Sequence, residues 1–378
     1  MIIQRLVTQQ LINKLEPCKA VLLYGPRRVG KTTLLKEVAS RLASKEKVSM
    51  VSGEIRIIQD DLSSRSIERL ARLIGDNTLF IIDEAQYVPN IGLALKLLVD
   101  HLPKLKVIAS GSASFDLAQK VGEPLTGRKK TVCLYPIAAT EIIATHNLTY
   151  YRETLEDYLI FGNYPEVFQL TSAQQKKEYL RELVESYLFK DILSLEQVRN
   201  PRKLRDLLAL LAFQIGREVS LLELGRSLEM SKDTVSRYLD LLEKSFIIVN
   251  IRGFSRNLRK EVSKTSRYYF YDNGVRNAII NNFNRINLRD DVGMLWENYL
   301  IIERLKKQAY SELLVNNYFW RTYDQKEIDW VEERGGQLFG YEISWKKKKA
   351  KCADVWLNTY SNAQYQQIDQ ENFLTFIT

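Results

Sequence analysis

The feature that most constrains this chain is a glycine-rich loop at residues 25–32, placed directly after a short apolar run. Residues 20–24 read AVLLY, which is typical in length and composition of a buried parallel strand. From residue 31 to residue 42, apolar side chains recur at helical spacing. A strand that leads into a glycine loop and then a helix is typical of a nucleotide-binding α/β domain. The sequence therefore predicts such a domain near the amino terminus.

The loop matches the pattern G-x-x-x-x-G-K-T in full. Gly25 and Gly30 let the backbone curl so that its N–H groups point at phosphate oxygens. The Lys31 ammonium is expected to reach the β- and γ-phosphates, and the Thr32 hydroxyl to ligate Mg²⁺. The predicted cofactors are therefore ATP and Mg²⁺. The predicted nucleotide-binding residues are Gly25, Pro26, Arg27, Arg28, Val29, Gly30, Lys31, Thr32 and Thr33.

A second apolar run, residues 79–82, ends at the acidic pair Asp83 and Glu84. Ligands bind at the carboxyl edge of an open parallel sheet, so this pair is expected beside the loop. We predict that Asp83 binds Mg²⁺ and that Glu84 activates the attacking water as general base. The alternative is that both acids cap a helix. A glutamate beside the aspartate favours hydrolysis over simple nucleotide holding.

A third run, residues 107–109, ends at Ser110-Gly111-Ser112. Ser110 and Ser112 are predicted sensors that contact the γ-phosphate or the water, and a plain turn is the alternative. Arg128 follows a glycine and precedes the strand expected at residues 131–135. We predict that Arg128 reaches the ATP of a neighbouring subunit and stabilises charge on the transferred phosphoryl group. A surface arginine is the alternative. The predicted catalytic residues are Glu84, Lys31 and Arg128.

Composition narrows the remaining function classes. The net charge of +9 suggests an anionic partner such as nucleic acid, although a solvated basic surface would give the same count. Three widely spaced cysteines and two histidines supply neither a disulfide framework nor a zinc site. No apolar run approaches the ~20 residues needed to cross a bilayer. A cytoplasmic protein without a membrane partner is expected.

Residues 220–251 show the pattern of a winged helix, with three short helical segments followed by a β-like run. Ser231 is expected to cap the recognition helix. The basic segment that follows suits phosphate contacts, so DNA is the predicted partner. The alternative is a protein-docking module. The predicted DNA-binding residues are Lys232, Thr234, Arg237, Arg256, Arg259 and Lys260.

The last hundred residues carry a weaker pattern. Asp329 precedes a glycine turn, and Glu342 follows on the next expected strand, as in nucleases that cut with Mg²⁺. Glu297 adds a third acid. The usual lysine position holds Ser344, and Lys346 is the candidate substitute because it shares a strand face with Glu342. The favoured interpretation is a nuclease-like fold that is used for binding or assembly.

Taken in order, these motifs resemble a family of bacterial and archaeal AAA-type ATPases, in the AAA+ superfamily, with a C-terminal domain of unknown function. The resemblance covers essentially the whole chain, and the stretches around residues 25–33, 79–86, 109–112 and 125–128 carry it most specifically. It implies an α/β fold with a parallel-sheet core. The implied domains are the AAA+ core at 1–148, a helical lid at 149–200, a winged helix at 201–276 and a restriction-endonuclease-like domain at 277–378.

The leading functional prediction is an ATP-hydrolysing AAA+ protein that binds DNA and remodels or translocates it. It would act as a homo-oligomeric ring, with a hexamer expected, and branched DNA is one candidate substrate. One alternative is a nucleotide-operated switch in regulation or defence whose carboxyl-terminal domains hold partner proteins. Another is an ATP-gated nuclease, which the serine at position 344 disfavours.

Overall fold

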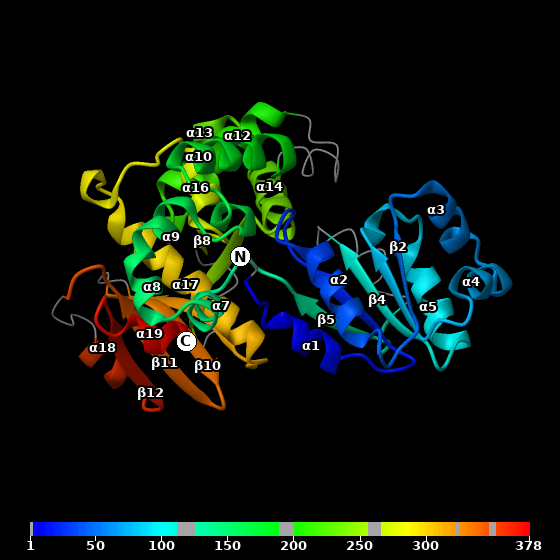
Figure 1. Cartoon of the computed structure of the whole chain (residues 1–378). Coiled ribbons are helices and arrows are strands. Elements are labelled where there is room, and N and C mark those ends of the chain that lie inside the picture. Colours follow the sequence, from blue (N-terminus) through cyan, green and yellow to red (C-terminus); the bar gives the residue numbers. More distant parts are fainter. Residues whose placement is uncertain (1–2, 112–124, 189–199, 256–265, 323–325, 348–352) are drawn as a thin grey trace. The chain divides into compact units, whose positions relative to one another are not determined.

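The computed structural model describes residues 3–111, 125–188, 200–255, 266–322, 326–347 and 353–378. The chain divides into two compact units. The amino-terminal unit is Ile2–Ile137, and the carboxyl-terminal unit is built from Ala138–Glu243 and Ile247–Thr378. In Figure 1 the amino-terminal unit runs from blue to cyan, and the remaining colours mark the carboxyl-terminal unit.

The amino-terminal unit is a parallel α/β sheet with strand order β2-β3-β4-β1-β5. The three strands predicted to begin at residues 20, 79 and 107 are confirmed as β1, β3 and β4. The helix predicted after the glycine loop is confirmed as α2. Strand β2 was not predicted, since its sequence VSMVS is half polar and all its side chains are half-buried. The elements are α1 Val7–Asn13, β1 Ala20–Tyr24, α2 Lys31–Leu42, β2 Val48–Ser52, α3 Arg56–Ser63, α4 Ile67–Ile74, β3 Leu79–Asp83, α5 Ile91–His101, β4 Lys106–Gly111 and β5 Lys129–Cys133.

Both faces of this sheet are covered, which explains why β1 and β3 are buried along their whole length. The chain moves one way across the sheet from β1 to β2 and the other way from β3 to β4. Because parallel crossovers are right-handed, α2 and α5 must pack on opposite faces, as Figure 1 shows. Strand β1 lies between β4 and β5, so the order reverses at this strand. That reversal is the usual ligand-binding position of an open α/β sheet.

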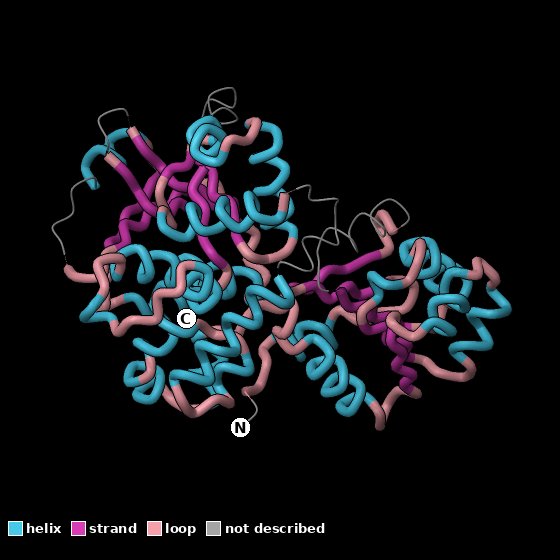
Figure 2. The backbone as a smooth tube through the Cα atoms, turned by 90° about the horizontal axis from the view of Figure 1, so that it is seen from above, coloured by secondary structure: helices cyan, strands magenta, loops and turns pink. Residues whose placement is uncertain are grey.

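The carboxyl-terminal unit combines helices with a seven-stranded mixed sheet in the order β12-β11-β10-β9-β7-β8-β6. Its elements are α7 Ala139–Thr145, α8 Leu148–Glu153, α9 Leu155–Phe161, α10 Ala173–Glu182, α12 Pro201–Phe213, β6 Glu218–Val219, α13 Leu221–Leu228, α14 Lys232–Lys244, β7 Ile248–Gly253, β8 Ser266–Phe270, α16 Asn273–Ile279, α17 Val292–Tyr310, β9 Asn316–Arg321, β10 Glu327–Arg334, β11 Gln337–Ile343, α18 Ala353–Thr359, β12 Ala363–Ile368 and α19 Phe373–Ile377. Figure 2 shows strands in magenta and helices in cyan. No helix in the described ranges combines the length and apolarity required to cross a membrane.

Two helices, α13 and α14, precede β7 where the sequence analysis expects three short helical segments, so the third expected segment is wrong. Strand β7 pairs antiparallel with β8 and, on its other side, parallel with β9. The sheet therefore continues across residue 276, where the sequence places a domain boundary. The four-part division of the chain and the winged-helix identity stay predictions.

A tight crossing joins two loops of the carboxyl-terminal unit that are far apart in sequence. Gly162 ends α9 with a left-handed φ of 70°, and a Cβ there would lie 2.0 Å from Oδ1 of Asp272. The buried Asp272 carboxylate accepts hydrogen bonds from the backbone N–H of Asn163 at 2.6 Å and of Val275 at 3.0 Å. A Cβ at Gly274 would lie 2.1 Å from the carbonyl oxygen of Phe161. Neither glycine position has room for a side chain.

Gly162→Ala is therefore expected to destabilise the protein by more than about 2 kcal/mol, because it adds a clash with a buried carboxylate to a strained backbone. Chemical denaturation of the purified variant measures this. The matched control is Gly293→Ala in α17, where an added Cβ meets nothing within 4 Å. The control should keep or slightly raise stability, since alanine favours helix over glycine by about 1 kcal/mol. Equal stability of the two variants would contradict the prediction.

Candidate functional site

The glycine loop connects β1 to α2 through three unusual backbone positions. Gly30 lies immediately before α2 with φ of 96°, and Arg28 is left-handed with φ of 62°. At Gly25 a Cβ would lie 2.2 Å from the carbonyl oxygen of Leu134, so only glycine fits beneath the neighbouring strand's continuation. These positions turn the loop around the amino-terminal end of α2, where free N–H groups and the helix dipole favour a phosphate.

The Lys31 side chain is buried and reaches back across the loop. Its Nζ donates to the carbonyl oxygens of Gly25 and Pro26, each at 3.0 Å. The ammonium thus lies within the curl of the loop. Arg28 is exposed, and Val29 is buried beneath the loop. The exposed side chains of Thr32 and Thr33 begin α2.

The ends of three strands meet beside this loop. Thr32 Oγ1 donates to Oδ2 of Asp83, at the end of β3, over 2.6 Å. The other Asp83 oxygen accepts from the hydroxyl of Ser110, at the end of β4. Ser110 Oγ also accepts from the backbone N–H of Glu84 at 3.2 Å. The structure therefore brings together Lys31, Thr32, Asp83, Glu84 and Ser110, as the sequence analysis expects.

Glu84 has a left-handed backbone with φ of 51°. Its carboxylate accepts a hydrogen bond from Nε2 of Gln86 at 2.5 Å. The backbone turn is packed tightly, because a Cβ at Gly53 would lie 2.5 Å from the Glu84 carbonyl oxygen. The backbone N–H of Gly53 donates to the Asp83 carbonyl oxygen at 2.7 Å. Sequence reasoning gave no role to Gly53 or Gln86, although Gln86 follows the acidic pair by two positions.

Arg5 is a second contributor that sequence reasoning missed. It is buried, and its guanidinium donates to the carbonyl oxygen of Val29 at 3.1 Å and of Tyr135 at 2.5 Å. Arg27 donates to the hydroxyl of Tyr87 at 2.7 Å. No motif marks Arg5, because a lone arginine near the amino terminus resembles any surface arginine in sequence. Arg5 therefore anchors the glycine loop to the backbone that follows β5.

These residues fit ATP and Mg²⁺ by their chemistry. The Thr32 hydroxyl and the Asp83 carboxylate are adjacent oxygen donors, which is the ligand type that Mg²⁺ takes alongside phosphate oxygens. The turned loop supplies N–H donors and Lys31 supplies positive charge. Burial raises the pKa of the nearby Cys133 thiol to about 12, which disfavours the nucleophilic thiolate. The assignment of individual roles stays a prediction.

Two predicted residues lie outside this cluster. Arg128 precedes β5, at the opposite edge of the sheet from the glycine loop, because Ala20 and Lys129 are paired at the start of β1 and β5. Its Nε donates to Asp100 at 2.6 Å, and 43% of its side chain is exposed. Arg128 therefore does not contact the loop of its own chain. Ser112 lies outside the described residues.

Three of the predicted DNA-binding residues lie in α14. Lys232 and Arg237 are exposed and Thr234 is half-buried. Ser231 caps the helix as expected, since its Oγ accepts from the Thr234 N–H at 3.2 Å. The Arg237 guanidinium lies over the ring of Tyr238, 5.7 Å from its centroid. Arg256, Arg259 and Lys260 lie outside the described residues.

Two of the predicted nuclease-like acids, Glu297 and Asp329, lie near a buried arginine. Arg267 in β8 is buried, and its guanidinium contacts Asp329 Oδ1 at 3.4 Å and Glu327 Oε2 at 2.7 Å. Glu297 Oε1 accepts from the hydroxyl of Tyr269 at 2.7 Å. Among the described residues no group of three histidine, cysteine, aspartate or glutamate side chains is arranged to hold a metal ion. The positive charge within this acidic cluster comes from Arg267, which sequence reasoning missed.

Burial dominates the electrostatics of this acidic cluster. It raises the pKa of Glu297 to about 8, with the Asp329 charge adding to the shift. It also raises the pKa of Asp329 to about 6, while Arg267 and the Ile343 N–H oppose that rise. Glu342 accepts from the Tyr365 hydroxyl at 2.6 Å, and the Lys346 side chain is exposed. Ser344 is buried.

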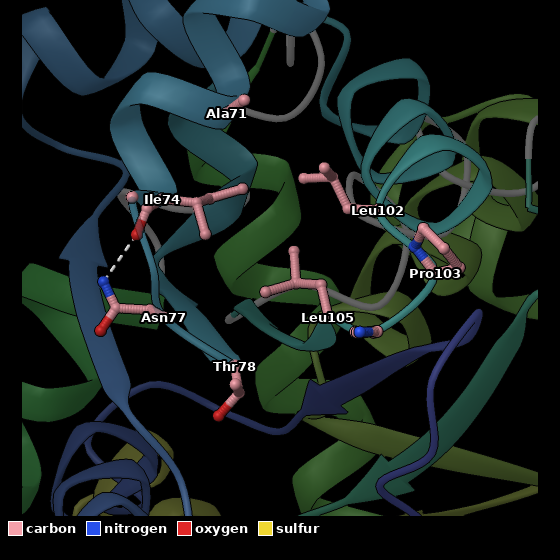
Figure 3. A pocket seen from close by; sticks show the side chains of 9 residues that line it. Ala71, Ile74, Asn77, Thr78, Leu102, Pro103 and Leu105 are labelled. Carbon is pink, nitrogen blue, oxygen red and sulfur yellow. Dashed lines mark hydrogen bonds between the residues drawn. The ribbon is translucent and has the colours of Figure 1, made fainter.

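The amino-terminal unit also contains an apolar cavity of about 350 Å³, shown in Figure 3. Leu102, Pro103 and Leu105 line one side, and Ala71 and Ile74 of α4 line the other. Thr78, which lines it too, immediately precedes β3. The cavity therefore lies at the amino ends of β3 and β4, away from the carboxyl edge that carries the glycine loop. It is separate from the nucleotide site.

Family models match three consecutive parts of the chain. Residues 18–143 match an AAA domain. Residues 152–286 match a domain of unknown function (DUF8612), and residues 292–368 match another (DUF4143). The AAA match covers β1 to β5 and therefore the whole cluster around the glycine loop.

Two relatives carry no more than the description uncharacterized protein. An uncharacterized protein of Mycobacterium tuberculosis is 28% identical over 340 residues, covering 88% of this chain and 72% of the relative. An uncharacterized protein of Methanocaldococcus jannaschii is 20% identical over 410 residues, covering 99% and 90%.

Solved structures of the replication initiator DnaA also match, among them a complex with AMPPCP and single-stranded DNA. They show 16% identity and a TM-score of 0.34, covering 63% of this chain and 86% of that chain. A similarity this low has no bearing on function. The family match and the parallel sheet instead carry the identification. The amino-terminal unit matches the AAA domain over residues 18–143, and two regions that match domains of unknown function follow it.

Proposed function

We propose that this protein hydrolyses ATP with Mg²⁺ at the glycine loop and uses the energy to remodel or translocate DNA as a homo-oligomeric ring. The observation that best supports hydrolysis is the contact between Thr32 Oγ1 and Asp83 Oδ2 at 2.6 Å. The two oxygens that we propose bind Mg²⁺ are therefore adjacent. When bound, Mg²⁺ neutralises charge on the phosphate oxygens.

Each side chain then has a defined task. Lys31 and the loop N–H groups bind and orient the β- and γ-phosphates. Ser110 holds the Asp83 carboxylate and the Glu84 backbone in one arrangement through its single hydroxyl. Glu84 takes a proton from the attacking water. Gln86 holds the Glu84 carboxylate through its amide, so release of that hydrogen bond frees the base.

A ring is supported by the position of Arg128. This arginine lies at the edge of the sheet opposite the glycine loop. A subunit that presented its loop edge to the Arg128 edge of its neighbour would receive a positive charge at the γ-phosphate. Repeating that head-to-tail contact generates a closed ring, for which we propose a hexamer. Arg128 would exchange Asp100 for phosphate on assembly.

DNA binding is supported by the net charge of +9 and by the exposed side chains of Lys232 and Arg237 on α14.

The second candidate function is a nucleotide-operated switch that holds partner proteins. The pairing of Arg128 with Asp100 within one chain favours it, since that pairing suits a monomer. DNA cleavage is not proposed, because the Arg267 guanidinium contacts Asp329 and Glu327 in the acidic cluster.

The deciding experiment measures ATPase rate and DNA binding with duplex, forked and four-way DNA at low salt. Stimulation by DNA is expected, and Lys232→Gln/Arg237→Gln should weaken it. Two phosphate contacts on a duplex contribute about 1.8 to the slope of log affinity against log salt. Arg202→Gln/Arg205→Gln on α12 is the charge-matched control. The switch would be favoured if none of the three DNA forms changed the ATPase rate and the protein stayed monomeric with ATP.

A further inference from the structure

A second cavity, of about 580 Å³, lies within the carboxyl-terminal unit and belongs to no motif used so far. The side chains of Arg285, Asn287, Trp345 and Lys346 line it. The volume falls in the range of sites that bind small molecules and cofactors. Two cations and an indole ring, against the single carboxylate of Glu156, favour a ligand that is both flat and anionic.

Glu156 also lines the cavity, and its carboxylate is engaged by the backbone N–H of Ile286, whereas the other polar side chains are not engaged elsewhere. Arg285, Asn287 and Lys346 make no side-chain hydrogen bond or ion pair within the described ranges. Lys347, the next residue, differs because its Nζ pairs with Glu371 at 3.0 Å. Arg285 and Lys346 therefore lie at the cavity with their charge available to a ligand.

The wall that carries Arg285 and Asn287 is held in place on both sides. Glu156 Oε1 accepts the backbone N–H of Ile286 at 3.1 Å, between the two residues. Arg289 fixes the end of the same loop, since its guanidinium contacts both carboxylate oxygens of Asp291, at 2.7 Å and 2.8 Å. A wall that is fixed before binding loses less conformational entropy when a ligand arrives.

The aromatic wall is fixed as well. The ring of Trp345 packs edge to face on the fully buried Trp296, with 5.2 Å between ring centroids. The backbone carbonyl of Trp345 accepts from Gln370 Nε2 at 2.6 Å. Trp345 is half-buried, so part of its side chain stays accessible. A half-buried indole ring beside free cations is the arrangement by which proteins stack a base and hold its phosphate.

We propose that this cavity binds a nucleoside phosphate, with the base stacked on Trp345 and the phosphate between Arg285 and Lys346. The ligand is either a free nucleotide or one unit of a single strand, since both present the same ring and phosphate. Asn287 supplies a donor and an acceptor for the base edge. The site uses no residue of the glycine loop, so it is independent of ATP hydrolysis.

The test measures binding of dTMP and of a short fluorescent oligothymidylate to the full chain carrying Lys31→Ala, so that the glycine loop takes no nucleotide. Arg285→Gln/Lys346→Gln should weaken oligothymidylate binding at least tenfold and reduce its salt slope by about 1.4, or about 0.7 for each lost contact. Arg202→Gln/Lys347→Gln, which removes the same charge, should bind within about twofold of the Lys31→Ala parent. Trp345→Leu should lose about tenfold through stacking.

If the cavity variants bind both dTMP and the oligothymidylate more weakly, the cavity binds a free nucleotide. If only oligothymidylate binding is weakened, the cavity binds one unit of a single strand. Far-ultraviolet circular dichroism shows whether Trp345→Leu has folded. If that variant is unfolded, the test rests on Arg285→Gln/Lys346→Gln, whose substitutions lie at the surface. The proposal is overturned if the Lys31→Ala parent binds neither ligand. It is also overturned if the cavity variant matches the charge-matched control.

Discussion

Replacing Glu84 by glutamine should leave ATP binding intact and lower turnover by about 10²–10⁴-fold, the usual contribution of a general base. Glutamine keeps the size and the hydrogen-bonding oxygen of glutamate, so the turn that Ser110 and Gly53 hold should persist. Only the ability to take a proton from water is removed. Single-turnover hydrolysis and equilibrium nucleotide binding, measured on the same preparation, separate these two effects.

Two controls make the result specific. Glu54→Gln removes an exposed carboxylate from the segment that follows β2 and should keep wild-type turnover. Lys31→Ala should lose ATP binding itself, because the ammonium that lies within the loop is the direct phosphate contact. Full turnover by Glu84→Gln would show that another group activates the water.

Replacing Arg267 by methionine should destabilise the carboxyl-terminal unit by about 3–5 kcal/mol, the usual effect of removing one partner from a buried ion pair. Asp329 and Glu327 would lose their cation, and Glu297 would lose the nearby charge that lowers its pKa. Methionine fills similar space without charge. Urea denaturation at neutral pH measures the loss.

The loss should also depend on pH. The folded-state pKa of Glu297, about 8, lies above its ordinary value of 4.5, so the folded state binds this proton more tightly than the unfolded chain does. Stability from this group is present at low pH and falls as pH rises through about 8. Asp329 behaves likewise around pH 6. Without Arg267 both pKa values rise further, so the deficit of the variant should grow from about pH 6 to about pH 8.5.

Arg321→Met is the matched control for this comparison. Arg321 pairs with Glu218 at the surface, where 35% of its side chain is exposed. A pair of this kind contributes about 0–1 kcal/mol, and little of that should vary between pH 6 and pH 8.5. If Arg267→Met were as stable as Arg321→Met at every pH, the guanidinium would not be what neutralises the acidic cluster.

The sequence predicts which residues gather around the glycine loop because the signals for that arrangement are local. The strand, the loop and the helix that form it are consecutive in residues 20–42, and their glycines and lysine are read directly. The acidic pair also follows its own strand. Each strand ends at the carboxyl edge of a parallel sheet, so the convergence of Thr32, Asp83 and Ser110 follows from topology alone.

Features that depend on distant pairing were not predictable in this way. Strand β7 looks like the start of a self-contained wing, yet β9, some sixty residues later, adds to its free edge. Arg267 meets Asp329 and Glu327 only because β8 and β10 lie in the same sheet. In the sequence it is one basic residue among many. Single-sequence patterns report local periodicity and carry no direct signal for such partners.

Arg5 has a mechanical consequence. Its guanidinium joins Val29, inside the phosphate-binding loop, to Tyr135, two residues before the amino-terminal unit ends at Ile137. A shift of the loop on nucleotide exchange would pull on this side chain and so on the outgoing polypeptide. A single buried side chain thus links the glycine loop to the point where the rest of the chain is attached.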